Sequence, residues 1–180
     1  MISERTSTRR LVLLSLFAAC GLVLFVFESF LPVLPWFRPG FGNIATILAL
    51  LFFGFGDAVK VTMLRIVLGA LVLGSLLTPV FIFAFSGGIA SILVMAFVLR
   101  CTKHIFGPVG LSVFGAVAHN MVQLLIAYLL FVKNPEIFIL LPVFIATGVL
   151  TGTLTGLVSA IIIEKSQLRF GFEAFVPKVG

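Results

Sequence analysis

Residues 43–56, which read NIATILALLFFGFG, decide how this chain is arranged. At 1.5 Å per residue this segment reaches only about 21 Å, which is short for a hydrocarbon core of about 30 Å. If it crosses a membrane, six apolar stretches divide the chain and the basic residues gather on one side. If it does not cross, every later loop changes sides and that asymmetry is inverted. We therefore predict that it crosses and turns at Gly54, Gly56 and Asp57 into the next apolar stretch.

Six membrane spans follow from this reading of the sequence. Their approximate ranges are 11–31, 43–56, 57–77, 79–99, 109–132 and 137–163. The N-terminal side of the membrane then holds nine of the twelve basic residues: Arg5, Arg9, Arg10, Lys60, Arg100, Lys103, Lys165, Arg169 and Lys178. The opposite side holds Arg38 and Lys133, and Arg65 lies inside a span. This positive-inside bias predicts that both termini are cytoplasmic.

The composition points to the same class of protein. Apolar residues make up 61% of the chain, charged residues 10%, and the mean hydropathy is +1.31, whereas soluble domains are about half apolar and a quarter charged. We predict an all-α multi-pass protein with a cytoplasmic N-terminus (1–10), a six-helix transmembrane domain (11–163) and a cytoplasmic interfacial tail (164–180). The net charge of +6 is explained by topology and by anionic lipid headgroups, so no nucleic-acid partner is expected.

Several polar residues fall inside the predicted spans, where they are costly. A central Arg costs about 2.5–3.5 kcal/mol on insertion scales, and Arg65 is near the middle of the third span. His119, Asn120 and Gln123 are three or four residues apart in the fifth span and so share one broad helix face. Glu28 lies near the outer end of the first span. Two interpretations are open: an outward-facing cavity for a carboxylate, phosphate or carbonyl group, or an internal network that locks the helices together.

The loop between the first two spans is long and rigid. Residues 32–42 contain three prolines together with Trp36 and Arg38. A structured loop of this kind can act as a lid over a binding site. It can equally be an interfacial connector whose aromatic residues lie at headgroup level.

Two stripes of small residues suggest close helix packing. In the last span Gly148, Gly152, Gly156 and Ala160 follow one another at four-residue spacing, which lets another helix approach closely. Packing within the same chain is the simpler interpretation. A shorter stripe in the first span, formed by Ser15, Ala18 and Ala19, has the same interpretation or faces a partner subunit.

Signs of catalysis are poor. The chain has six acidic residues, and only Glu28 and Asp57 border the spans, whereas magnesium-dependent phosphoryl or prenyl chemistry needs clustered carboxylates. We expect that the protein is not an enzyme and that it has no metal site and no cofactor.

Three segments resemble a known family. They are residues 35–43, residues 64–69, and residues 115–120 with Gln123. In this order they resemble the Gx transporter family, often labelled heptaprenyl diphosphate synthase component I. That family is similar in architecture to the substrate-binding S components of energy-coupling factor transporters, which have six helices, an outward-facing pocket and a first loop that acts as a lid.

The resemblance implies a bacterial inner-membrane protein that binds a small molecule and docks on a transmembrane coupling subunit driven by two ATPase subunits. Ser15, Ala18 and Ala19 would be the docking residues. The expected substrate-binding residues are Glu28, Trp36, Arg38, Asn43, Arg65, His119, Asn120 and Gln123.

Three functions remain open from the sequence. The first is capture of a vitamin-like, flavin-related or quinone-related molecule for an ATP-driven transporter. The second is a noncatalytic membrane subunit associated with polyprenyl diphosphate, quinone or redox enzymes. The third is a standalone channel or carrier, which the lack of matching broken helices in the two halves disfavours.

Overall fold

The computed structural model describes residues 2–30, 40–102 and 105–170, and all regular structure in these ranges is helical. Its elements are α1 (Ile2–Ser29), α2 (Asn43–Phe53), α3 (Phe55–Val72), α4 (Pro79–Cys101), α5 (Pro108–Ala127), the π-helical turn η1 (Tyr128–Val132), the 3-10 helix η2 (Pro135–Leu140) and α6 (Leu141–Phe170). The predicted all-α class is confirmed for this part of the chain. Helix α1 begins before the predicted first span, and α6 continues beyond the predicted last one.

Four of these helices are long and apolar enough to cross a membrane, which makes this a membrane protein. They cover Arg10–Ser29, Pro79–Cys101, Pro108–Val132 and Pro135–Ser166 within the described residues. Helix α2 has only 11 residues. Helix α3 has 18 residues, three of them charged: Asp57, Lys60 and Arg65.

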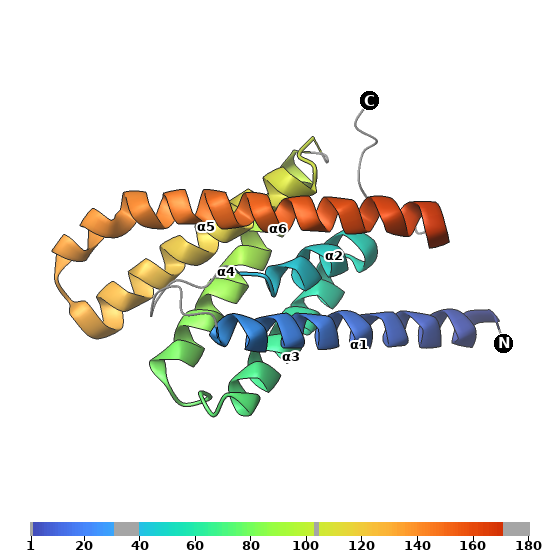
Figure 1. Cartoon of the computed structure of the whole chain (residues 1–180), viewed down its shortest axis with the longest axis horizontal. Helices are drawn as coiled ribbons and strands as arrows, with labels where there is room; N and C mark the ends of the chain where they lie inside the picture. The colour runs from blue at the N-terminus through green and yellow to red at the C-terminus, as the bar shows by residue number, and fades with distance from the viewer. Residues whose placement is uncertain (1, 31–39, 103–104, 171–180) are drawn as a thin grey trace.

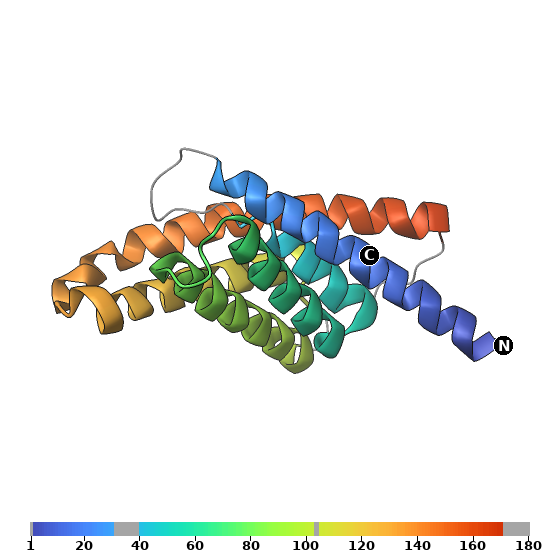
Figure 2. The same cartoon turned by 90° about the horizontal axis from the view of Figure 1, so that it is seen from below.

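The helices form one elongated bundle, shown in Figures 1 and 2. Helix α4 packs between α3 and α5, and α1 packs on α3 and α2. Helices α5 and α6 make an antiparallel pair with the most extensive contact in the bundle. The beginning of α1 and the end of α6 lie at the same end of the molecule (Figure 1).

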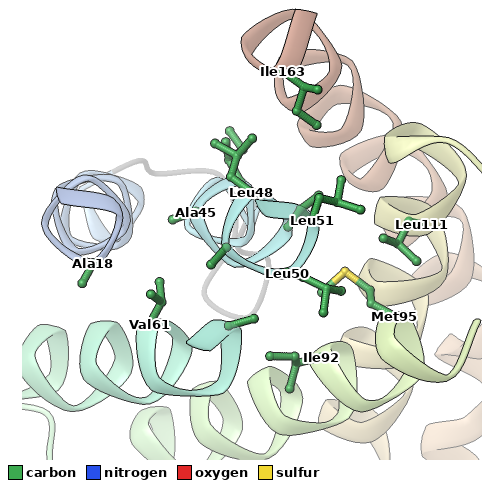
Figure 3. Packing of buried hydrophobic residues seen from close by; sticks show 14 residues of the cluster. Ala18, Ala45, Leu48, Leu50, Leu51, Val61, Ile92, Met95, Leu111 and Ile163 are labelled. Atoms are coloured by element: carbon green, nitrogen blue, oxygen red, sulfur yellow. The ribbon is translucent and has the colours of Figure 1, made fainter. Parts of the chain in front are cut away.

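Helix α2 is the centre of the core. Every residue from Asn43 to Leu51 is buried, whereas most helices in a bundle keep one face exposed. Figure 3 shows why: α1, α3, α4, α5 and α6 surround it, and Ile92, Met95 and Leu111 approach from the sides. Since protein covers α2 from Asn43 to Leu51, this part of the helix does not need the length of a lipid-exposed span.

The turn between α2 and α3 depends on Gly54. Its φ of +89° and ψ of −177° are strained for any residue with a Cβ atom. The N–H of Gly54 donates to the carbonyl of Leu50 at 3.1 Å, and its carbonyl accepts from the N–H of Ala58. The predicted turn is present, but Gly54 alone ends α2 and starts α3, because Gly56 and Asp57 already belong to the first turn of α3.

Asp57 ties α1 to the first turn of α3. Its carboxylate is buried and accepts from Arg10 Nε at 2.8 Å and from Lys60 Nζ at 3.0 Å. Both basic side chains are mostly exposed, so solvent weakens the attraction, but the buried carboxylate needs these donors.

Replacing Asp57 with asparagine should lower stability by about 1 kcal/mol, because it removes the charge while keeping the size. Thermal melting in detergent should show a fall of a few degrees, and Glu164→Gln, a change at an exposed position on α6, should melt like the parent protein. Equal melting of D57N and the parent would contradict a stabilising role for Asp57.

The glycine ridge of α6 packs on α5. A Cβ atom at Gly152 would lie 2.6 Å from Val113 Cα, and one at Gly156 would lie 2.6 Å from Val109 Cα. At Gly148 it would lie 3.0 Å from Val117 Cα. The backbone of α5 therefore fits directly against the glycines, and the two helices can approach closely. Ala160, the last residue of the stripe, is partly exposed.

Hydroxyl groups line the same interface. Thr151, Thr155 and Ser159 each donate to the carbonyl four residues earlier, at 2.8–2.9 Å. Thr155 Oγ1 also pairs with Ser112 Oγ of α5 at 2.7 Å. Both uses of the hydroxyls, backward to their own helix and across to a neighbour, occur here.

Candidate functional site

Arg65 is the one described arginine that is buried in the bundle. Its side chain lies on α3, and only 4% of the residue is exposed. The sequence places it there because α3 must continue for almost three turns after the Gly54 turn before it reaches position 65. A cation at this depth must be compensated by the residues around it.

Asn43 and Phe25 hold the guanidinium. Arg65 Nη2 donates to Asn43 Oδ1 at 3.2 Å, and the guanidinium carbon lies 5.9 Å from the centre of the Phe25 ring. That distance is within the range of a cation–π interaction. Arg65 of α3 is thus joined to the start of α2 and to α1.

Glycines make room for the side chain. A Cβ atom at Gly42 would collide with Arg65 Nη1, and one at Gly21 would lie 3.0 Å from Arg65 Cδ. Gly69, one turn after Arg65, is similarly close to the ring of Phe25. The guanidinium therefore fits because glycines, which have no side chain, stand beside it on α1 and just before α2.

Glu28 supplies the nearby negative charge. It is buried near the end of α1, its carboxylate attracts the Arg65 guanidinium, and Oε1 accepts a hydrogen bond from the backbone N–H of Phe41. Glu28 is thus attracted to the Arg65 guanidinium, and its carboxylate also fixes the chain just before α2.

One polar atom of Arg65 is left over. Within the described part of the chain Arg65 Nε is buried and has no hydrogen-bond partner. A buried unpaired donor costs roughly 1–3 kcal/mol. The guanidinium therefore has capacity for a further acceptor such as a carboxylate, phosphate or carbonyl oxygen.

The other predicted polar residues lie at different helix interfaces. The imidazole of His119 on α5 packs on Gly87 of α4, where a Cβ atom would lie 2.7 Å from His119 Cε1. Asn120 Nδ2 donates to Phe144 O at 2.9 Å and to Thr147 Oγ1 at 3.2 Å, both in α6. Asn120 therefore joins α5 to α6, while Gln123 is half-buried on α5.

The remaining predicted residues divide as follows. Trp36 and Arg38 lie outside the described residues. Ser15 and Ala19 are exposed on α1, whereas Ala18 is buried against the core at 5% exposure. Ala18 therefore faces away from the surface that Ser15 and Ala19 present.

Sequence reasoning missed the residues that shape the site without being polar. Phe25, Gly21 and Gly42 carry no sign of their role individually. Gly21 and Phe25 are one turn apart on α1. A search for a small residue and an aromatic residue on one helix face could therefore have suggested a position where a cation packs.

Comparisons with known proteins identify the family. A sequence model described as heptaprenyl diphosphate synthase component I matches residues 17–162, which is most of the chain. The chain belongs to that family. No curated protein and no solved structure matches it.

The region shared with the heptaprenyl diphosphate synthase component I family contains the whole Arg65 site. Glu28, Asn43 and Arg65 all lie within residues 17–162, as do His119 and Asn120. Among the described residues no group of three or more His, Cys, Asp or Glu side chains is arranged to hold a metal ion. In this family member the described candidate site is therefore a buried cation with an amide and a carboxylate beside it.

Proposed function

We propose that this protein is the noncatalytic substrate-binding subunit of an energy-coupling factor type ABC transporter. It binds a small vitamin-like, flavin-related or quinone-related molecule in the membrane and passes it to a transmembrane coupling subunit with two ATPase subunits. The resemblance to S components and the apolar six-helix bundle support this function.

The single observation that carries the proposal is Arg65. A guanidinium buried in an apolar bundle with an unpaired Nε is expensive to maintain for packing alone. Three helices contribute residues around the guanidinium, so a ligand bonded to it would affect all three helices. The chemistry of the cation selects an acidic or carbonyl-bearing molecule.

Co-purification tests this function. The tagged protein, extracted gently from its native membrane, should carry a membrane subunit and two ATPases, together with a small molecule that mass spectrometry detects after denaturation. Substrate uptake into vesicles that contain this chain without any ATPase would overturn the proposal.

The proposed topology is six crossings with both termini in the cytoplasm. Helices α2 and α3 then cross as a pair, although α2 is short. The position that distinguishes six crossings from four is the α2–α3 turn, because a four-span protein would leave that turn outside. The basic residues Lys60 and Arg10 beside the turn favour the cytoplasm.

Cysteine labelling in sealed cells should decide the topology. With Cys20 and Cys101 replaced by serine, cysteines at Lys133, Gly56 and Lys165 are introduced one at a time. A membrane-impermeant maleimide should label only position 133 from outside. Gly56 suits this test because a Cβ atom there meets nothing within 4 Å. External labelling of position 56 would rule out six crossings.

A second function is favoured by the family description. Its words, heptaprenyl diphosphate synthase component I, fit a noncatalytic membrane subunit that associates with polyprenyl diphosphate or quinone enzymes. In that case a soluble prenyl synthase, rather than ATPases, would co-purify with the tagged protein.

A further inference from the structure

A groove opens at the far end of α2 from the Arg65 site. Its volume is about 680 Å³. One wall is formed by residues 50–55, which end α2 and turn into α3. The other wall is formed by α4, by Leu99 and mainly by a stripe whose members are three, four and seven residues apart: Leu93, Ala96, Phe97 and Arg100.

The groove is apolar and uncovered. Phe97 is 67% exposed, Leu93 51% and Phe55 46%, so the described protein leaves these side chains to the surroundings. Ala96, which also lines the groove, is small, so a larger side chain at this position would reduce the groove's volume. In a membrane protein such a surface faces hydrocarbon chains.

One end of the groove is positively charged. Arg100 lies in the last turn of α4, is exposed and lines the groove. The acidic group of the adjacent α3 turn, Asp57, is already paired with Arg10 and Lys60. No described acidic side chain is therefore paired with Arg100 across a salt bridge, and its guanidinium is available to an anion.

We infer that this groove binds one anionic phospholipid of the cytoplasmic leaflet. Leu93 and Arg100 are two helical turns, about 10 Å, apart, so a chain held along α4 descends from the headgroup region into the hydrocarbon. The volume corresponds to roughly twenty groups of water or methylene size, which suits an acyl chain. The Arg100 guanidinium then pairs with the headgroup phosphate, on the side where anionic lipids gather.

The charge at the groove favours a phosphodiester over a prenyl diphosphate. A phosphodiester carries one negative charge and matches one guanidinium. A diphosphate carries more charge, and proteins usually compensate it with several cations or with carboxylate-bound Mg²⁺, whereas among the described residues Arg100 is the one charged side chain that lines this groove.

Native mass spectrometry of the purified protein, mixed with phosphatidylglycerol or phosphatidylcholine, tests the lipid site. The parent protein should retain one phosphatidylglycerol in preference to phosphatidylcholine. Arg100→Gln should reduce that retention at least fivefold, and Ala96→Phe should reduce it by filling the groove. Two control variants should behave like the parent: Lys165→Gln, at an exposed basic position, and Leu154→Phe, on the exposed face of α6.

Three results would overturn this inference. The first is equal retention of the two lipids by the parent protein. The second is unchanged phosphatidylglycerol retention in R100Q, a conservative variant that tests the site even if A96F does not fold. The third is displacement of phosphatidylglycerol by an equal concentration of geranylgeranyl diphosphate. Loss of co-purifying protein subunits in A96F with lipid retention unchanged would instead show a protein-docking groove, and the lipid site would be wrong.

Discussion

Replacing Arg65 with methionine should abolish retention of the small molecule that co-purifies with the protein. The guanidinium is the buried cation of the site, and a hydrogen bond to a charged group contributes about 1.5–3 kcal/mol. Loss of the charged hydrogen bond should therefore weaken binding by about 10- to 150-fold. Arg65→Lys keeps the charge but not the planar fork, and we expect a loss of about tenfold. Quantitative mass spectrometry of the released molecule measures both.

The Arg65 experiment needs a control for folding. Removing the cation alone leaves Glu28 buried without its counter-charge, and breaking a buried pair costs about 3–5 kcal/mol. The double variant Glu28→Gln, Arg65→Met removes both charges and should melt closer to the parent protein. Lys133→Ala, in an exposed loop, should change neither melting nor binding. If the double variant folds and retains the molecule normally, Arg65 has only a structural role.

The second large effect is expected at the α5–α6 interface. Gly152→Ala places a methyl group 2.6 Å from Val113 Cα, and since the neighbour is backbone, it cannot rotate away. Overpacking of this kind costs about 1–3 kcal/mol, or roughly 3–10 °C in melting temperature for a chain of this size. The separation of the helices should also lengthen the Ser112–Thr155 hydrogen bond. Melting in detergent measures the effect.

Gly107→Ala is the matched control for that change. Gly107 precedes α5, and a Cβ atom there has nothing within 4 Å. It should melt within about 1 °C of the parent protein, since surface substitutions rarely exceed 0.5 kcal/mol. Gly152→Leu should be worse than Gly152→Ala and reduce the yield of folded protein. Equal melting of the two alanine variants would show that the close α5–α6 contact contributes nothing.

The helices could be predicted from the sequence because each apolar stretch has clear limits. Helix α4 starts at Pro79 as predicted, and α5 starts one residue before its predicted limit. Because these helices expose apolar surfaces, runs of apolar residues in the sequence show directly where each helix lies. That α2 crosses the membrane was inferred from charges on distant loops rather than from its own length, and it stays a prediction. The burial of its residues 43–51 depends on other helices, and no local pattern contains that information.

The candidate site was harder to predict because the sequence does not show which neighbouring helix each side chain faces. Successive residues of an α-helix point about 100° apart, so His119 meets α4 while Asn120, the next residue, bonds to α6. Their spacing with Gln123 predicted one shared polar face. Arg65 could be recognised as a buried charge, but its partners Asn43 and Phe25 come from separate helices. Only the tertiary packing brings them together.

The buried position of α2 has a consequence for how the protein is made. A segment of 11 residues is too short to partition stably into lipid alone, because a span needs about 20. While the ribosome is still producing α4 to α6, α2 lacks the walls that enclose it in Figure 3. We expect the nascent chain to hold α2 loosely beside α3 at first, and to close around it only after α6 has been inserted. Assembly in the membrane would then end with the innermost helix becoming ordered last.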